Sequence, residues 1–221
     1  MDAKVEEMRV KISRLGKLLF DRFITDAAGG NLSARVGEVV CITSRYCGQK
    51  YQWNIRPEQV LVVDMNGNKL DGEGDISRES KVHLKLYRDF QDGNSVIHCH
   101  PRNVLVFCAA GKPIQPVIEG TWKFGEIKVV SYAPAHSARL SDDIADALRG
   151  QDARIRKHAA AVIGRYHGLF VLAKDVDAAF DAAERIENNA RIILLNSALA
   201  SGCDLADAQK AALGAALAQF E

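Results

Sequence analysis

Helical and strand-like segments alternate along this chain in an order that limits the folds open to it. Apolar residues recur at steps of three and four over residues 5–24, and helical spacing returns over residues 78–90, which predicts amphipathic helices. Short apolar runs lie between and after them, and Asn66-Gly67-Asn68 is a hairpin turn signal. This order predicts a layered α/β fold whose sheet is at least partly antiparallel.

The other segments complete this order. We expect further helices at residues 101–110, 141–150 with Ser141 as N-cap, 176–200 and 204–219. We expect strands at residues 32–36, 39–43, 60–65, 94–100, 127–132, 160–163 and 169–173. Residues 44–57 carry Tyr46, Tyr51 and Trp53 among polar residues and predict a structured loop.

Length and charge narrow the class of protein. The 221 residues suit a single domain spanning 1–221, which is long enough to bury a core without disulfides or a structural metal. The formal net charge of +1 leaves no basic footprint for nucleic acid. No apolar run approaches the roughly 20 residues of a membrane span, and the first residues carry acids where a signal peptide carries bases. We therefore expect a cytoplasmic protein without a nucleic-acid or membrane partner.

Two histidines alternate in the strand predicted at residues 94–100. Alternate residues of a strand share one face, so His98 and His100 would project together at a Cα separation of roughly 6.5–7 Å. Such a pair either shares a metal ion or is hydrogen-bonded within the strand. His167, which precedes the turn-forming Gly168, is the candidate third ligand. Three histidines with an open position are the composition of a catalytic zinc site.

A carboxylate at the predicted start of a helix is the next candidate. Glu79 lies four residues before His83, so the two share a helix face and His83 could orient the carboxylate. The alternative is a glutamate without chemistry, which the helix dipole and capping favour in a first turn.

Five short motifs occur along the chain in one order and carry a resemblance. They are Gly29-Gly30-Asn31-Leu32-Ser33-Ala34-Arg35, Ser77-Arg78-Glu79 followed by His83, His98-Cys99-His100, Ser131-Tyr132-Ala133-Pro134 and Tyr166-His167-Gly168. The ordered set resembles the zinc-dependent class II aldolase/adducin family over residues 8–200. The resemblance implies a three-layer α/β/α sandwich around a mostly antiparallel central sheet. It also implies a cyclic homotetramer with active sites at subunit interfaces.

The resemblance implies a metal centre with one Zn²⁺ per chain. The family's HxH pair and its later His-Gly bind the ion, a role that falls on His98, His100 and His167 here. The glutamate of the family's Ser-Ser-Glu segment corresponds to Glu79, as a fourth ligand or as the base that moves a proton to or from carbon. Zn²⁺ would stabilise, as a Lewis acid, the enediolate left when a carbon–carbon bond beside a ketone breaks.

The resemblance also implies a site for the substrate phosphate. The family's Gly-Asn turn and a serine before the glutamate correspond to Gly30, Asn31 and Ser77. The segment after the second strand adds Thr43 and Ser44 as candidate contacts.

This chain departs from the family at two positions of that site. Arg45 and Arg78 stand where the family has small glycine and hydroxyl contacts. Arginine binds phosphate or carboxylate in a bidentate manner, so both are candidate ligands of an anionic substrate, either phosphate or carboxylate. The alternative is that at least one of them pairs with a surface carboxylate.

Two further residues each have two alternative interpretations. Another group must take the proton from the hydroxyl that becomes an aldehyde, and in one member of the family a tyrosine of the neighbouring subunit does so. Counting from the HxH pair places Glu119 there, as a second acid/base or as a loop glutamate without a role. His136 stands where relatives often have glycine, and we interpret it as a surface loop residue that could otherwise contact substrate.

The resemblance implies a metal-dependent carbon–carbon lyase. It would cleave a ketose 1-phosphate, or a similar small sugar phosphate, reversibly to dihydroxyacetone phosphate and an aldehyde through an enediolate. A sugar-phosphate 4-epimerase and a sugar-acid decarboxylase of the same family are alternatives, and the arginines would suit the carboxylate of the latter. A non-catalytic adducin-like binding domain is a further alternative, although all four candidate metal ligands are present here.

Overall fold

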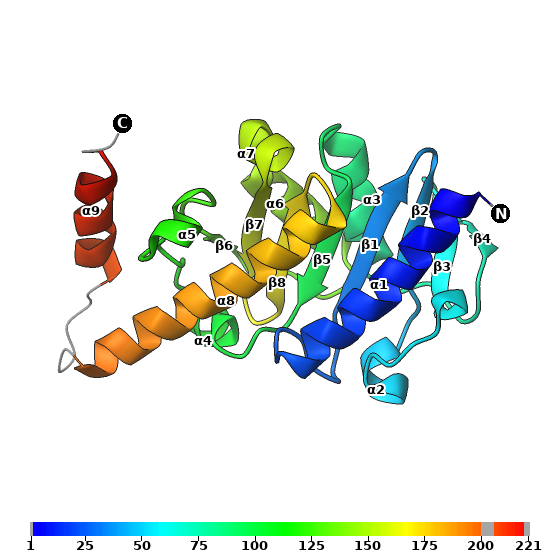
Figure 1. Ribbon diagram of the computed structural model, residues 1–221, viewed down its shortest axis with the longest axis horizontal. Helices are drawn as coiled ribbons and strands as arrows, with labels where there is room; N and C mark the ends of the chain where they lie inside the picture. The colour runs from blue at the N-terminus through cyan, green and yellow to red at the C-terminus, as the bar shows by residue number, and fades with distance from the viewer. Residues whose placement is uncertain (1, 200–205, 219–221) are drawn as a thin grey trace.

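The computed structural model describes residues 2–199 and 206–218 (Figure 1). In these residues one sheet of eight strands has the order β4-β3-β2-β1-β5-β8-β7-β6. The strands are β1 (Asn31–Val36), β2 (Val39–Thr43), β3 (Val60–Asp64), β4 (Lys69–Asp71), β5 (Ser95–Cys99), β6 (Lys128–Val130), β7 (Ala159–Gly164) and β8 (Gly168–Ala173). Only β6 and β7 pair in parallel, so the sheet is mixed and mostly antiparallel, as expected.

Helices cover both faces of the sheet. They are α1 (Ala3–Asp21), α2 (Cys47–Tyr51), α3 (Ser80–Asp89), α4 (Val104–Ala110), α5 (Glu119–Trp122), α6 (Ala138–Leu148), α7 (Asp152–Lys157), α8 (Val176–Leu199) and α9 (Ala206–Leu217). In Figure 1, α1 and α8 cross the near face of the sheet, while α3, α6 and α7 lie behind it. The three-layer α/β/α arrangement is therefore confirmed.

The central strands are apolar on both sides because each side meets a helical layer. In β8, Leu169 and Val171 pack toward α1 and α8, and the intervening Phe170 and Leu172 pack toward α3 and α6. Every residue of β8 is buried. A strand buried on both faces has a continuous apolar sequence, which is why this run lacks polar alternation.

Several helix boundaries differ from the prediction. Helix α6 begins at Ala138 because the Ser137 hydroxyl accepts the Leu140 backbone N–H at 3.1 Å. Ser141 is buried inside the first turn, so its prediction as the N-cap is wrong. The predicted helix at residues 101–110 begins only at Val104. The hairpin turn expected at Asn66-Gly67-Asn68 joins β3 to β4, whereas α2, α5 and α7 are short helices that the sequence did not predict.

The structure describes most of the residues predicted to form the two C-terminal helices. Helices α8 and α9 match the ranges predicted at 176–200 and 204–219, whose remaining residues 200, 204–205 and 219 lie outside the described part. In the described residues, no helix is both long enough and apolar enough to span a bilayer.

Candidate metal centre and substrate cavity

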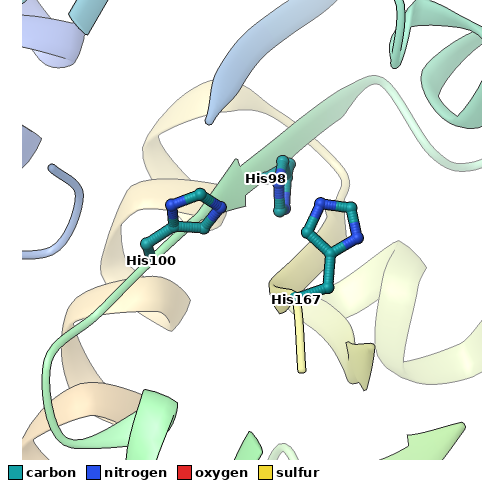
Figure 2. A group of neighbouring side chains, drawn as sticks. All are labelled: His98, His100 and His167. Carbon is teal, nitrogen blue, oxygen red and sulfur yellow. The ribbon is translucent and has the colours of Figure 1, made fainter. Parts of the chain in front are cut away.

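Three histidines from two neighbouring strands converge at one end of the sheet. His98 lies on β5, His100 follows the end of that strand, and His167 lies in the turn between β7 and β8. Because β5 pairs antiparallel with β8, with Cys99 opposite Leu169, the end of β5 is brought beside that turn. Figure 2 shows the three rings turned toward a common point. One nitrogen of each ring lies within 4.8 Å of the others, close enough to hold one metal ion.

Hydrogen bonds orient two of these rings. His98 Nδ1 is 3.0 Å from the carbonyl oxygen of Leu169 and must donate to it, which leaves the Nε2 lone pair free. The His98 ring also stacks on Phe170 at 4.1 Å. His100 Nδ1 lies 3.1 Å from the carboxylate of Asp26. A carboxylate or carbonyl behind a histidine is the usual support of a metal ligand.

The free nitrogens fit a bound metal ion. Nε2 of His98 and Nε2 of His100 are buried and have no hydrogen-bond partner. Burial lowers the pKa of His98, although the charge of Glu79 opposes this effect, and a lower pKa favours the neutral imidazole that coordinates a metal. Buried polar atoms without partners are uncommon, and a metal ion would satisfy both nitrogens.

Glu79 faces the same point from the N-terminus of α3. The buried Glu79 is the N-cap residue of this helix, one position before its first turn. Its Oε2 lies 3.1 Å from His98 Nε2, and its Oε1 lies 2.9 Å from His167 Nε2. Burial alone would raise the pKa of Glu79, but the interactions with His98 and His167 outweigh it and lower that pKa well below its usual range. Glu79 is therefore ionised and available as a ligand or base.

Two polar side chains hold Glu79 in place. Asn31 Nδ2 lies 3.3 Å from Glu79 Oε2 and 3.2 Å from the hydroxyl of Ser77. The Ser77 hydroxyl also accepts the backbone N–H of Glu79 at 3.3 Å. The predicted residues of β1 and of the segment before α3 are thus brought together around the carboxylate.

Gly168 allows the histidines to approach one another. A Cβ atom at this position would lie 2.7 Å from both the Cys99 carbonyl oxygen and His100 Cδ2, and 3.0 Å from His98 Cε1. Any larger residue would push the β7–β8 turn away from the end of β5. The glycine of the sequence motif is therefore required by packing around the histidines.

A cavity of about 270 Å³ opens over this cluster. Its lining contains the three histidines, Glu79, Gly29 and most of the predicted substrate contacts: Gly30, Asn31, Arg45, Ser77 and Arg78. It also contains Tyr46, Gly48, Gln49 and His136. The cavity therefore combines a candidate metal centre with two arginines.

Two predicted substrate contacts lie outside the lining. The Thr43 hydroxyl accepts the backbone N–H of Leu32 at 3.1 Å, and Thr43 is buried. The buried Ser44 hydroxyl lies 3.4 Å from the sulfur of Cys47. The end of β2 turns these hydroxyls into the protein, where both residues support the loop that follows the strand.

His83 makes a different contact from the predicted one. Its Nδ1 lies 2.6 Å from the hydroxyl of Ser33, which also contacts the hydroxyl of Tyr87 at 2.6 Å. No hydrogen bond joins His83 to Glu79. Asn31 donates to the carboxylate instead, and Ser77 accepts the backbone N–H of Glu79.

Glu119 is exposed in the first turn of α5 and does not line the cavity of its own chain. The prediction places it across a subunit boundary, which one chain does not test. In Figure 1, α5 lies near the end of the sheet that carries β6.

Two further residues lie at the site. His136, in a loop, lines the cavity with its Nδ1 3.8 Å from Glu79 Oε1, which favours the alternative that it contacts substrate. Its φ of +69° is unusual for a residue other than glycine. Asp26 was not considered, although an acid shortly before a Gly-Gly turn was a usable signal.

The fold and site together define a protein whose α/β/α sandwich carries a histidine-rich candidate metal centre at one end of its sheet. Comparison with known families is more specific. The family described as Class II Aldolase and Adducin N-terminal domain matches residues 10–194, and the chain belongs to this family.

The relatives differ from one another in activity. The L-fuculose phosphate aldolase of Methanococcus maripaludis is 28% identical over 180 residues, which cover 81% of this chain and 92% of that protein. The 3-oxo-tetronate 4-phosphate decarboxylase of Pectobacterium atrosepticum is 24% identical over 200 residues, covering 86% of this chain and 85% of that protein. A solved structure of L-fuculose 1-phosphate aldolase matches with a TM-score of 0.77 at 23% identity, covering 97% and 98% of the two chains, and supports the fold.

Proposed function

We propose that this protein is a zinc-dependent aldolase that cleaves a ketose 1-phosphate to dihydroxyacetone phosphate and an aldehyde. The observation that carries the proposal is the convergence of His98, His100 and His167 on the ionised carboxylate of Glu79. Three imidazole nitrogens and a carboxylate oxygen are a donor set that suits Zn²⁺. The sugar-phosphate aldolases among the relatives support the choice of substrate.

Zn²⁺, when bound by these residues, supplies Lewis-acid stabilisation of negative charge on the oxygen of the substrate ketone. Glu79 moves the proton at carbon. In the condensation direction its carboxylate accepts a proton from the carbon beside the ketone of dihydroxyacetone phosphate, and in cleavage it returns that proton to the enediolate. Asn31 and Ser77 keep the carboxylate aimed at that carbon.

A second group handles the proton at oxygen. In cleavage, a base takes the hydroxyl proton of the carbon that becomes the aldehyde, and the electrons of the broken carbon–carbon bond form the enediolate. We assign this base to Glu119 of a neighbouring subunit, because Glu119 is exposed and outside the cavity of its own chain. The proposal therefore includes a cytoplasmic homotetramer of single-domain chains, with active sites at its interfaces.

A sugar-acid decarboxylase is the second candidate. Two arginines line the cavity, and guanidinium groups also bind carboxylates. The decarboxylase among the relatives supports it. The same centre would then stabilise the enediolate left by loss of carbon dioxide.

The test begins with metal analysis of the purified protein. We expect one zinc per chain, and we expect His98→Ala to lose most of it. Turnover is then measured on a panel of ketose 1-phosphates with an assay coupled to dihydroxyacetone phosphate. Release of carbon dioxide from 3-oxo sugar-acid phosphates is measured in parallel.

Three outcomes separate the candidates. Zinc with formation of dihydroxyacetone phosphate supports the aldolase. Zinc with carbon dioxide release alone replaces the aldolase by the decarboxylase. A metal-free protein without either activity contradicts both and favours an adducin-like binding role.

A further inference from the structure

Two arginines of the cavity have no anionic partner. Arg45 and Arg78 both line it, and among the described residues neither guanidinium forms an ion pair or a hydrogen bond. We propose that Arg45 and Arg78 bind the anionic group of the substrate, while Asn31 and Ser77 act as positioning residues for Glu79. This inference rests on the proposed function, since it names the group by which that substrate is recognised.

The backbone brings the two arginines together. The backbone N–H of Arg45 donates to the carbonyl oxygen of Asp75 at 2.8 Å. Ser44 and Ile76 form an isolated antiparallel bridge. The segment after β2 and the segment before α3 therefore run side by side, and they deliver one arginine each to the same cavity.

An aromatic ring holds one of the guanidinium groups. The guanidinium carbon of Arg45 lies 4.4 Å from the centre of the Tyr46 ring. The ammonium of Lys50 lies 5.5 Å from the same ring. A stacked guanidinium has lost part of its conformational freedom before the anion arrives, so less entropy is lost on binding.

The amide donor of Asn31 is already engaged. Both hydrogens of the Asn31 amide nitrogen have acceptors, one on the Ser77 hydroxyl and one on Glu79 Oε2. The Ser77 hydroxyl also accepts the Glu79 backbone N–H. The Asn31 amide nitrogen is thus committed to Ser77 and Glu79, and the Ser77 oxygen accepts in both of its contacts, which leaves the guanidinium groups as the charged donors for a ligand.

The charge balance of the cavity selects an anion. Glu79 is the one carboxylate among the described lining residues, and it is committed to His98 and His167. Two positive charges remain uncompensated. A phosphate monoester has up to two negative charges and three acceptor oxygens, whereas a carboxylate has one charge and two oxygens. The arrangement therefore favours a phosphate ester, with a carboxylate as the other source of the same oxyanion chemistry.

The experiment measures binding of inorganic phosphate and of acetate by calorimetry. It uses the purified protein, with and without EDTA treatment, because phosphate also binds metals. The variants are Arg45→Gln, Arg78→Gln, Ser77→Ala and the matched control Arg156→Gln, whose exposed guanidinium pairs with Asp92. Arg78→Lys keeps the charge and removes the planar fork.

We expect each cavity arginine variant to weaken phosphate binding at least about tenfold, as for the loss of a charge-assisted bidentate contact. Arg78→Lys should be intermediate, and Arg156→Gln should bind like the wild type. Ser77→Ala should change phosphate binding less than about threefold. In turnover, the arginine variants should raise KM while Ser77→Ala lowers kcat. Acetate binding tighter than phosphate, with the same arginine dependence, would keep the assignment and identify the anion as a carboxylate.

The inference is overturned if the wild type binds neither anion, or if both arginine variants bind phosphate as well as the wild type does. Its failure is separable from failure of the proposed function. Arginine-dependent phosphate binding in a protein without aldolase turnover would retain the anion site and remove the reaction. Aldolase turnover with an unchanged KM in both variants would do the reverse.

Discussion

The carboxylate of Asp26 lies 3.1 Å from Nδ1 of His100, so an acid outside the cavity lining orients one of the three converging histidines. The same oxygen accepts the backbone N–H groups of Ala28 and Gly29, at 2.9 and 3.2 Å. Asp26 therefore joins the glycine turn that borders the cavity to the ring of His100. It also keeps the Nε2 atom of that ring facing the other histidines.

Replacing Asp26 should weaken metal binding without unfolding the protein. We expect Asp26→Ala to lower zinc affinity about 10- to 100-fold, the usual effect of removing a carboxylate behind a metal-bound histidine. Asp26→Asn should cost less, because the amide oxygen still accepts the Nδ1 proton. The measurement is chelator competition for zinc, with Asp92→Asn as the control on the surface. Equal zinc affinity in Asp26→Ala and wild type would show that His100 needs no such support.

Adding one methyl group at Gly168 should disturb the same centre. Gly168→Ala places a Cβ 2.7 Å from His100 Cδ2 and from the Cys99 carbonyl oxygen, closer than real Cβ contacts. We expect lower zinc affinity and a free energy of unfolding reduced by about 1–3 kcal/mol. Gly37→Ala is the control, since its Cβ would meet open space and cost only its left-handed backbone. Metal affinity distinguishes the two variants, and an unaffected Gly168→Ala would contradict the packing argument.

Replacing either of the two proposed acid/base residues should lower turnover, and a mixture of the two variants should recover part of it. Glu79→Gln should keep the fold and lose about 10²- to 10⁴-fold of turnover, the usual contribution of a general acid/base. Glu119→Gln should also lose turnover but keep its zinc affinity. If the two residues meet at a subunit interface, mixing the two variants by refolding should restore about one quarter of the sites by random assortment. Absence of any recovery, in a mixture shown to contain hybrid oligomers, would place both residues in one chain or remove Glu119 from the mechanism.

The buried His83 should make stability depend on pH. Its burial lowers its pKa from 6.5 to about 3. Between those pH values the unfolded chain binds more protons than the folded one, so the free energy of unfolding falls as the pH falls from 6.5 toward 3. His83→Asn keeps a hydrogen-bond partner for Ser33. It should reduce the pH dependence of the free energy of unfolding by up to about 1.4 kcal/mol per pH unit, the contribution of one proton.

Denaturant unfolding of EDTA-treated protein at pH 7, 6 and 5 measures this slope. Thr121→Ser, far from the site in α5, serves as a control for general destabilisation. Identical slopes in wild type and His83→Asn would mean that His83 gains access to a proton in the folded protein.

The spacing of apolar residues in the sequence predicted much of the fold. The helical spacing of residues 5–24 and 78–90 corresponded to α1 and α3, and the apolar runs corresponded to β1, β2, β3, β5, β7 and β8. Short elements such as α5 and α7 were not predicted, because four to six residues give too little pattern to separate a helical turn from a loop. The cap was predicted at Ser141 and lies at Ser137, because both are serines near one helix start and only backbone geometry distinguishes them.

Residues whose geometry is local could be predicted from the sequence. The alternation of His98 and His100 follows from the pleat of one strand, and the turn at Gly168 follows from a residue type. Tertiary structure decided which distant segments meet. Asp26 precedes β1 and His136 follows β6, so their positions at the site depend on how distant strands are ordered in the sheet. Strand order sets those loop positions through long-range contacts, and a pattern confined to neighbouring residues carries no information about them.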